Sequence, residues 1–343
     1  MSSSRLLLLS ALAALSFAVS SSAKEIKVDA GGAGDFKTVQ EAIDSVPANN
    51  TEEIHVLIQP GSYERQLIVP KNKGHLTLIG KGVKPDETIL TFHLKASDPK
   101  PGGAGNVGTT GSASVTINAT DFTAENVTFA NSAGDKVGQA VALKSNGDRL
   151  IFRTCRFLGF QDTLYPSGKG RVYFKDCYIT GNTDFIFGNA VAVFDRCTIN
   201  SSSPGFDTAA NTTPQQPYGF VFLDCTLTGS NGIQPGSVYL GRPWQWDRGS
   251  NASATYVRTK MGPHISPKGW HPWDAANTDP SKNTRYSEYA STDLDGKPLD
   301  ISKRVAWSHQ LTQDEADKIT VESVLGGTDQ WNPAAPATTQ LAK

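Results

Sequence analysis

A short pattern that recurs five times along the chain limits the fold more than any other feature of the sequence. Four copies read Phe, two residues, Cys, one residue and a large apolar residue, and a fifth copy has Val127 in the position of the cysteine. Successive copies are separated by 28, 22, 20 and 28 residues. A strand pattern with such a period is typical of a coil whose turns stack on one another. The copies begin at Ala124, Phe152, Phe174, Phe194 and Phe222.

The cysteines of this repeat occupy equivalent places, at Cys155, Cys177, Cys197 and Cys225. Strand alternation puts each cysteine and the residue two positions later on the same inner face. In parallel, in-register stacking, the Phe and Cys side chains then form ladders inside the coil, where cysteine acts as a small hydrophobic residue. The repeat explains these positions without oxidation, so we expect free thiols; two disulfides are the alternative for an exported chain.

Two capping boxes mark the ends of the repeat region. Thr38-Val-Gln-Glu41 starts an amphipathic helix that Pro47 ends, and Thr312-Gln-Asp-Glu315 starts a second helix through about Val324. We expect both to cover the open ends of the coil. The sequence thus predicts an all-β fold, a single right-handed parallel β-helix with an N-terminal helical cap and a C-terminal helix and tail. The right-handed winding follows from the usual handedness of connections between parallel strands. We expect residues 203–217 to form an inserted loop.

The N-terminus has the composition of a signal peptide. Arg5 precedes an apolar run from Leu6 to Val19, and small residues follow up to Ala23. The run is short for a membrane span, so we expect a cleaved signal peptide, 1–23, and a secreted domain, 24–343, extracellular or periplasmic; an uncleaved anchor is the alternative. No later segment is apolar for long enough to cross a membrane.

Charge and motifs exclude several classes of protein. The chain has 32 Lys and Arg against 33 Asp and Glu, which argues against a nucleic-acid binder. Its six histidines lack metal-ligand spacing, and the glycines at 102–105 lack the helix and lysine of a phosphate loop. We expect a monomer that binds no metal, cofactor, nucleic acid or membrane.

Two aspartates share one position in the repeat. Asp162 and Asp184 each lie seven residues after a repeat cysteine and three residues after a glycine. If the turns stack in register, equivalent positions lie about 4.8 Å apart. Two carboxylates that close cannot both ionise easily, so we expect one pKa to rise and the other to stay low, which gives an acid and an anion. The alternative is that both merely cap turns.

The surroundings of the pair favour chemistry. An apolar stretch follows Asp184 and partly desolvates it, while Gln139 and Gln161 offer uncharged amides to a developing oxyanion. Arg242 can pair with an ionised aspartate, and Trp244 can stack on a sugar ring. Taken alone, either glutamine also fits a structural turn, and the Arg-Pro-Trp turn also fits surface packing.

With these residues the chain resembles the pectin methylesterase (pectinesterase) family of carbohydrate esterases. Five strings match in the family's order: 61–64 (GSYE), 139–143 (QAVAL), 159–165 (GFQDTLY), 184–188 (DFIFG) and 240–244 (LGRPW). The resemblance implies a right-handed parallel β-helix and hydrolysis of the C6 methyl ester of galacturonate in homogalacturonan, the pectin polysaccharide, without a metal.

The resemblance also implies a role for each matched residue. Asp184 is similar to the family's nucleophile and Asp162 to its acid/base. Gln161 resembles the residue that stabilises the tetrahedral anion, Gln139 a second donor, and Arg242 the partner that keeps Asp184 ionised. The matched aromatic residues of the substrate cleft are Trp244, Tyr165 and Phe187, with Thr183 beside the nucleophile where the family often has Val or Ala.

Two other functions fit parts of the pattern. A pectin depolymerase on the same coil would use paired acids on a glycosidic bond, or Ca²⁺ in a lyase, although no acidic cluster with hard-cation spacing is present in the sequence. A non-catalytic polysaccharide-binding β-helix would need only the aromatic residues. Methanol release without a fall in viscosity separates the esterase from both.

Overall fold

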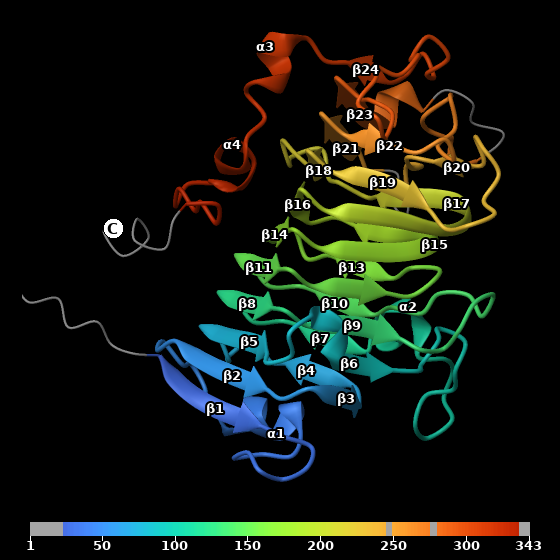
Figure 1. The fold of residues 1–343 in the computed structure, drawn as a ribbon. Coiled ribbons are helices and arrows are strands. Elements are labelled where there is room, and N and C mark those ends of the chain that lie inside the picture. The colour runs from blue at the N-terminus through green and yellow to red at the C-terminus, as the bar shows by residue number, and fades with distance from the viewer. Residues whose placement is uncertain (1–22, 245–248, 275–279, 336–343) are drawn as a thin grey trace, which may run out of the picture.

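Parallel strands wind into one coil in the computed structural model, which describes residues 23–244, 249–274 and 280–335 (Figure 1). The chain starts at one end of the coil and climbs turn by turn to the other. Within the described ranges, no helix has the length and apolar character needed to cross a bilayer. Residues 1–22 lie outside the described residues, so cleavage after Ala23 stays a prediction.

The first face of the coil is an eleven-stranded parallel sheet, in which each strand is followed by its equivalent one turn later. Backbone hydrogen bonds between turns fix the register, for example Phe152 opposite Phe174. In spatial order the sheet contains β1 (Lys24–Val28), β2 (Ile54–Ile58), β5 (Leu76–Gly80), β8 (Phe122–Glu125), β11 (Leu150–Arg153), β14 (Arg171–Lys175), β16 (Val191–Asp195), β18 (Phe220–Leu223), β21 (Ala252–Val257), β23 (Thr284–Tyr289) and β24 (His309–Gln310).

A second, thirteen-stranded sheet bends around the remaining two faces. Two long strands, β15 (Tyr178–Gly188) and β17 (Thr198–Ala210), continue across the bend, because β15 pairs with one face at its beginning and with the other at its end. One face holds β3 (Gly61–Glu64), β6 (Thr88–Phe92), β9 (Thr128–Asn131), β12 (Arg156–Leu158), β19 (Thr226–Gly229) and β22 (Lys260–Met261); the other holds β4 (Leu67–Val69), β7 (Val115–Ile117), β10 (Leu143–Ser145), β13 (Leu164–Pro166) and β20 (Val238–Tyr239).

The predicted interior ladder is present. The rings of the repeat phenylalanines stack from turn to turn at centroid distances of 5.1, 4.7 and 4.6 Å, and Tyr256 continues the stack at 4.4 Å. All of these side chains are buried, so the repeat supplies a continuous apolar core. The stacked residues are Phe152, Phe174, Phe194 and Phe222.

The four cysteines are buried free thiols, as the repeat predicts. Each thiol donates to a carbonyl of the preceding turn, for example Cys155 Sγ to the oxygen of Ala124 at 3.4 Å. The residue before each cysteine has a positive φ of 51–52°, which turns the chain at the same corner of every coil. These corner residues are Thr154, Asp176, Arg196 and Asp224.

The N-terminal cap is confirmed. Helix α1 (Val39–Ser45) begins at the capping box of Thr38 and Glu41 and packs on β1, β2 and β4 at the first turn of the coil. Three further short helical segments are α2 (Gly108–Gly111), η1 (Pro85–Glu87) and η2 (Ser281–Asn283).

The second predicted helix starts at the Thr312 capping box, as predicted, but its predicted length is wrong. The chain forms two short helices, α3 (Gln313–Ala316) and α4 (Val321–Leu325), because Thr320 accepts a hydrogen bond from the Ser323 amide and starts a new cap. Val324 and Leu325 pack on the outer face of the first sheet with Tyr173. The C-terminal segment therefore lies along the side of the coil instead of covering its end (Figure 1).

The predicted loop at 203–217 is also wrong in its first half. Residues up to Ala210 continue strand β17, which keeps pairing with β15 through a bulge between Gly181 and Ile186. Only the part after Ala210 is a loop. The additional residues of β17 pair with β15 on either side of Asp184, Phe206 with Thr183 and Thr208 with Ile186.

Candidate active site

Strand register brings Asp162 and Asp184 onto neighbouring turns, as the repeat predicts. Leu164 pairs with Ile186, two residues beyond each aspartate, and the Asp162 amide donates to the Thr183 carbonyl at 3.1 Å. Both aspartates have positive φ, 64° and 51°, a conformation that costs a non-glycine residue energy and often marks functional sites. Both line one cleft, so the alternative of two unrelated turn caps does not describe them.

Arg242 holds one member of the pair. Its Nε donates to one oxygen of Asp184 at 2.9 Å and its Nη2 to the other at 2.7 Å. The side chain of Asp184 is 8% exposed, so this two-pronged ion pair is largely shielded from water. The Arg242 amide donates to the Thr208 carbonyl on β17, which fixes the start of the Arg-Pro-Trp turn. Arg242 thus orients Asp184 and favours its ionised form.

Burial and charge separate the two carboxyl groups. Burial raises the pKa of Asp162 well above its usual value, and the charge of Asp184 raises it further against the opposing effect of Arg242. Burial also raises the pKa of Asp184, whereas hydrogen bonds and charge from Arg242 lower it. The prediction that one pKa stays low is therefore wrong, since burial affects both groups. Arg242 bonds Asp184 directly and acts on Asp162 only through its charge, so it favours the ionised form of Asp184 more strongly than that of Asp162.

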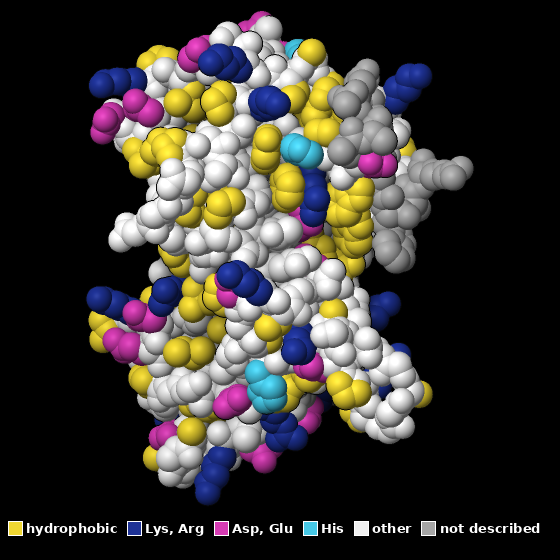
Figure 2. Space-filling model, turned by 90° about the vertical axis from the view of Figure 1, so that its right-hand side faces the viewer, with side chains coloured by type: hydrophobic (Ala, Val, Ile, Leu, Met, Phe, Trp, Pro, Cys, Tyr) yellow, Lys and Arg dark blue, Asp and Glu magenta, His cyan; other side chains and the backbone are white. Residues whose placement is uncertain are grey.

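The cleft around the pair has a volume of about 730 Å³. Its aromatic floor follows the coil axis: Tyr165 stacks on Phe187 at 4.2 Å, and Phe187 pairs with Ala209 on the next turn. Trp244 stands 5.8 Å from the Phe187 ring. Figure 2 shows a hollow near the middle of one face, where hydrophobic side chains flank a basic group with acidic atoms beneath it.

Both predicted amide donors lie at this cleft. Gln161 directly precedes Asp162, and the amide of Ala140, next to Gln139, donates to the Gln161 carbonyl at 3.1 Å. Adjacent turns thereby carry one glutamine each beside the acid pair. Eight of the nine predicted site residues line the cleft, and they are Gln139, Gln161, Asp162, Tyr165, Asp184, Phe187, Arg242 and Trp244.

Thr183 is the predicted residue that does not line the cleft. Its carbonyl accepts the hydrogen bond from Asp162, and its amide donates to the side chain of Asn182 at 2.6 Å. It pairs with Phe206 of β17 at the bulge. Thr183 therefore supports the spacing of the aspartates through its backbone.

Two aromatic residues at the site were not predicted from the sequence. Phe206 and Trp273 lie on Arg242, with ring centroids 4.1 and 4.3 Å from the guanidinium carbon. Such stacking favours the cation and holds its plane toward Asp184. Trp273 follows a proline, as Trp244 does, and this is the one sequence signal that could have indicated it. Residues 107–110, at the start of α2, also line the cleft.

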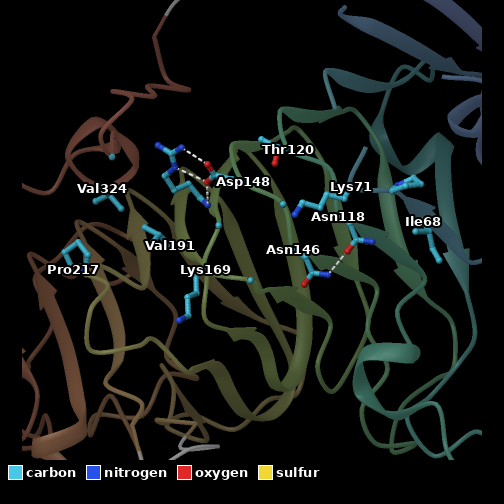
Figure 3. Close-up of a pocket in the computed structure, with 16 residues that line it drawn as sticks. Ile68, Lys71, Asn118, Thr120, Asn146, Asp148, Lys169, Val191, Pro217 and Val324 are labelled. Atoms are coloured by element: carbon cyan, nitrogen blue, oxygen red, sulfur yellow. Dashed lines mark hydrogen bonds and ion pairs between the residues drawn. The ribbon is translucent and has the colours of Figure 1, made fainter. Parts of the chain in front are cut away.

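A larger cavity of about 880 Å³ lies between the turns that follow β7 and β10 and the C-terminal segment (Figure 3). Four of its polar side chains are paired with one another: Asn146 donates to Asn118 at 2.7 Å, and Arg171 donates to Asp148. It has neither a carboxylate pair nor an aromatic floor. The described ranges contain no group of three or more His, Cys, Asp or Glu side chains that could hold a metal ion. The acid pair is thus the candidate active site among the residues that the structure describes.

Comparison with known proteins gives the same family for sequence and structure. The pectinesterase family model matches residues 25–328. The chain is 42% identical to pectinesterase 31 of Arabidopsis thaliana over 85% of this chain and 89% of that protein. Its structure resembles a pectin methylesterase from carrot, with a TM-score of 0.78 and 32% identity over 89% of this chain and 93% of that one.

A second solved structure adds a ligand to the comparison. It is a pectin methylesterase variant in complex with a hexasaccharide, similar at a TM-score of 0.75 and 30% identity over 92% of this chain and 100% of that one. These proteins share the right-handed parallel β-helix predicted from the repeat. The chain therefore belongs to the pectinesterase family of enzymes.

Proposed function

We propose that this enzyme hydrolyses the C6 methyl ester of galacturonate in homogalacturonan, giving a free carboxylate and methanol, with Asp184 as nucleophile and Asp162 as acid and base. The observation that carries the proposal is the stacked pair itself, with Arg242 bonded to both oxygens of one member only. That asymmetry gives one anion and one acid in a single cleft.

In the first half of the reaction, Asp184 attacks the ester carbonyl carbon and a tetrahedral anion forms. The amides of Gln139 and Gln161 stabilise that oxyanion without adding a charge that would quench the nucleophile. As the bond to the methoxy group breaks, Asp162 transfers its proton to the departing oxygen and methanol leaves. The product of this half is an acyl-enzyme anhydride on Asp184.

In the second half, Asp162 is a carboxylate and accepts a proton from water. The resulting hydroxide attacks the acyl carbon, the bond to Asp184 breaks, and the uronic acid is released. Asp162 regains its proton and Asp184 its charge, so both groups return to their starting states. Arg242 accompanies Asp184 through both halves and compensates its charge whenever that charge is present.

The cleft favours a polysaccharide. Tyr165, Phe187 and Trp244 present an aromatic surface along the coil axis, suited to the apolar faces of sugar rings. The hexasaccharide complex of a similar structure supports the same class of ligand. A cell-wall polysaccharide lies outside the cell, which agrees with the predicted export of residues 24–343; N-terminal sequencing of the secreted protein should begin at Lys24.

The test is methanol release from methylated pectin by the wild type, Asp184→Asn and Asp162→Asn. Each variant should lose at least about a hundredfold in kcat, while the viscosity of the pectin stays constant with the active enzyme. Asp224→Asn is the matched control, because Asp224 has the same left-handed backbone but lies in an exposed ion pair with Arg258. An Asp184→Asn enzyme as fast as this control, or a fall in viscosity, would overturn the proposal.

A further inference from the structure

Asp207 is a buried acidic residue of β17 that the proposed mechanism does not use. Its two neighbours on the strand both contact Arg242. The ring of Phe206 lies 4.1 Å from the guanidinium carbon, and the Thr208 carbonyl accepts a hydrogen bond from the Arg242 amide at 2.9 Å. Because Asp207 itself is 1% exposed, it can act on Arg242 only through the backbone that it shares with these two residues.

Asp207 also lies opposite the bulge that contains the proposed nucleophile. Two residues of β15, Asp184 and Phe185, face Asp207 alone, since the residue pairs on either side of them are in register. Two residues against one is the arrangement of a β-bulge, which redirects a side chain and is frequent beside active sites. Here Phe185 is buried in the core, while Asp184 turns into the cleft. The backbone at Asp207 therefore helps to set the direction of Asp184.

A hydrogen bond holds Asp207 across the irregular part of β17. Ser201 Oγ donates to Asp207 Oδ1 at 2.8 Å, and both residues are buried. Ser201 pairs with Gly181 before the register shifts, whereas Asp207 lies beyond the first shift. The bond therefore joins the two parts of β17 that the irregularity separates, and it stabilises the strand in its bulged form.

The surroundings of Asp207 suit a neutral acid. Its second oxygen, Oδ2, has no hydrogen-bond partner within the described ranges. Burial raises the pKa of Asp207 to about 7 against the lowering effect of the Ser201 hydrogen bond, and no described cation contributes to that pKa. A carboxylate in this place is buried without compensation, which is costly. Ionisation therefore favours a local rearrangement that brings the group to water.

The other titratable groups on the strands that pack against β17 do not compensate this acid. Tyr256 of β21 shares the interior with Asp207 and donates its hydroxyl to the Leu240 carbonyl at 2.9 Å. The remaining groups are Tyr178 and Asp184 of β15 and Tyr239 of β20, which face outward, and β19 carries none.

We propose that Asp207 is a positioning residue of the esterase, whose neutral side chain, bonded to Ser201, holds the bulge in the form that directs Asp184 and Arg242 into the cleft. This inference rests on the proposed function. Asp207 touches neither the substrate nor the reacting atoms. When it ionises, the bulge loses that form and the pair of Asp184 and Arg242 loses its alignment, so the enzyme is active only while Asp207 is protonated.

The test is the ratio of the kcat of Asp207→Asn to that of the wild type, measured as methanol release from saturating methylated pectin at pH 5 to 8. Asparagine stays neutral, and the ratio cancels the titration of Asp162. The ratio should be about one at pH 5 and rise about tenfold by pH 8, one unit above the pKa of Asp207. The ratio for the exposed control Asp224→Asn should not change with pH. A constant ratio for Asp207→Asn would overturn the inference.

Ser201→Ala removes the same hydrogen bond from its other end. Its kcat should fall about fivefold at pH 5 with an unchanged KM, the effect of one neutral hydrogen bond. An unchanged kcat would equally overturn the inference. Urea denaturation of each variant at the same pH values checks that the enzyme is folded during the assay.

A spectroscopic measurement separates this inference from the proposed function. Arg242 Nε donates to Asp184 at 2.9 Å, so the NMR signal of that N–H group reports the alignment of the ion pair. In the wild type the signal should shift as the pH passes about 7, and in Asp207→Asn it should stay constant. A signal that is constant in both, or that shifts equally in both, would refute the role of Asp207. If the wild type releases no methanol, the proposed function fails, while this signal still decides the role of Asp207.

Discussion

The inner and outer ladders of the coil are aligned by the same backbone hydrogen bonds, yet they use the register in opposite ways. Inside, the residue type repeats from turn to turn, as in the stack from Phe152 to Phe222. Outside, over the cleft, it changes at every turn, through Lys144, Tyr165, Phe187 and Ala209. Identical residues at equivalent positions give a continuous core, whereas different residues at equivalent positions place different chemical groups at a fixed spacing.

We expect substitutions in the inner ladder to change stability and substitutions in the outer ladder to change activity. Asp162 and Asp184 belong to the outer set, because their left-handed backbone turns them out of the strand alternation and into the cleft. Substitutions in the two ladders should therefore change different observables. Three substitutions, two inside and one outside, test that division.

Phe174→Ala should have the largest effect on stability. Phe174 is fully buried between Phe152 and Phe194, so truncation leaves a cavity in the middle of the stack. We expect the free energy of unfolding to fall by about 3–5 kcal/mol in urea denaturation. The kcat of the remaining folded enzyme should stay within about twofold of the wild type at low temperature. A large loss of kcat in Phe174→Ala, with the free energy of unfolding unchanged, would contradict the division between the two ladders.

Asp207→Asn tests an exception inside the coil. Asp207 is 1% exposed, accepts a hydrogen bond from Ser201 at 2.8 Å with one oxygen, and has no described partner for the other. Burial raises its pKa from an ordinary 3.8 to about 7. The folded state thus keeps a proton that the unfolded chain releases, so this group makes stability fall as pH rises from about 4 to about 7.

Asparagine keeps the hydrogen bond from Ser201 and removes that titration. The stability of Asp207→Asn minus that of the wild type should increase with pH across this window, by at most about 1.4 kcal/mol per pH unit, and level off above it. Urea denaturation at a series of pH values measures the difference. A constant difference from pH 4 to 8 would show that Asp207 is not protonated in the folded state.

Tyr165→Ala should have the smallest of the three effects and act on substrate binding. Tyr165 is only partly buried, stacks on Phe187 at 4.2 Å and lines the cleft. We expect KM for methylated pectin to rise by up to about tenfold, the size of one aromatic stacking interaction, with a change in unfolding free energy of about 1 kcal/mol. A large loss of stability with unchanged KM would place Tyr165 with the inner ladder.

The repeat made most of the fold and the acid pair predictable. Cys155 and Cys177 occupy equivalent positions on neighbouring turns. Asp162 and Asp184 each lie seven residues further along, so the strand register makes them neighbours as well. Trp273 was not predictable in this way, since it comes from a connection outside the strands. The predicted position of the C-terminal segment was wrong, because a capping box determines where a helix starts but not which surface the helix covers. The raised pKa of Asp184 depends on its burial in the folded structure, which the spacing of the repeat does not predict.

The most direct test of the coupled acid pair is the pKa of Asp162 itself, measured from its carboxyl signal by NMR or infrared difference spectroscopy in the wild type and in Asp184→Asn. The pKa should be well above the usual aspartate range in the wild type, because of burial and the charge of Asp184. It should fall in Asp184→Asn, which removes the charge and keeps the shape, while staying above the usual range because burial remains. A pKa of Asp162 that is ordinary in the wild type, or unchanged by Asp184→Asn, would contradict the account.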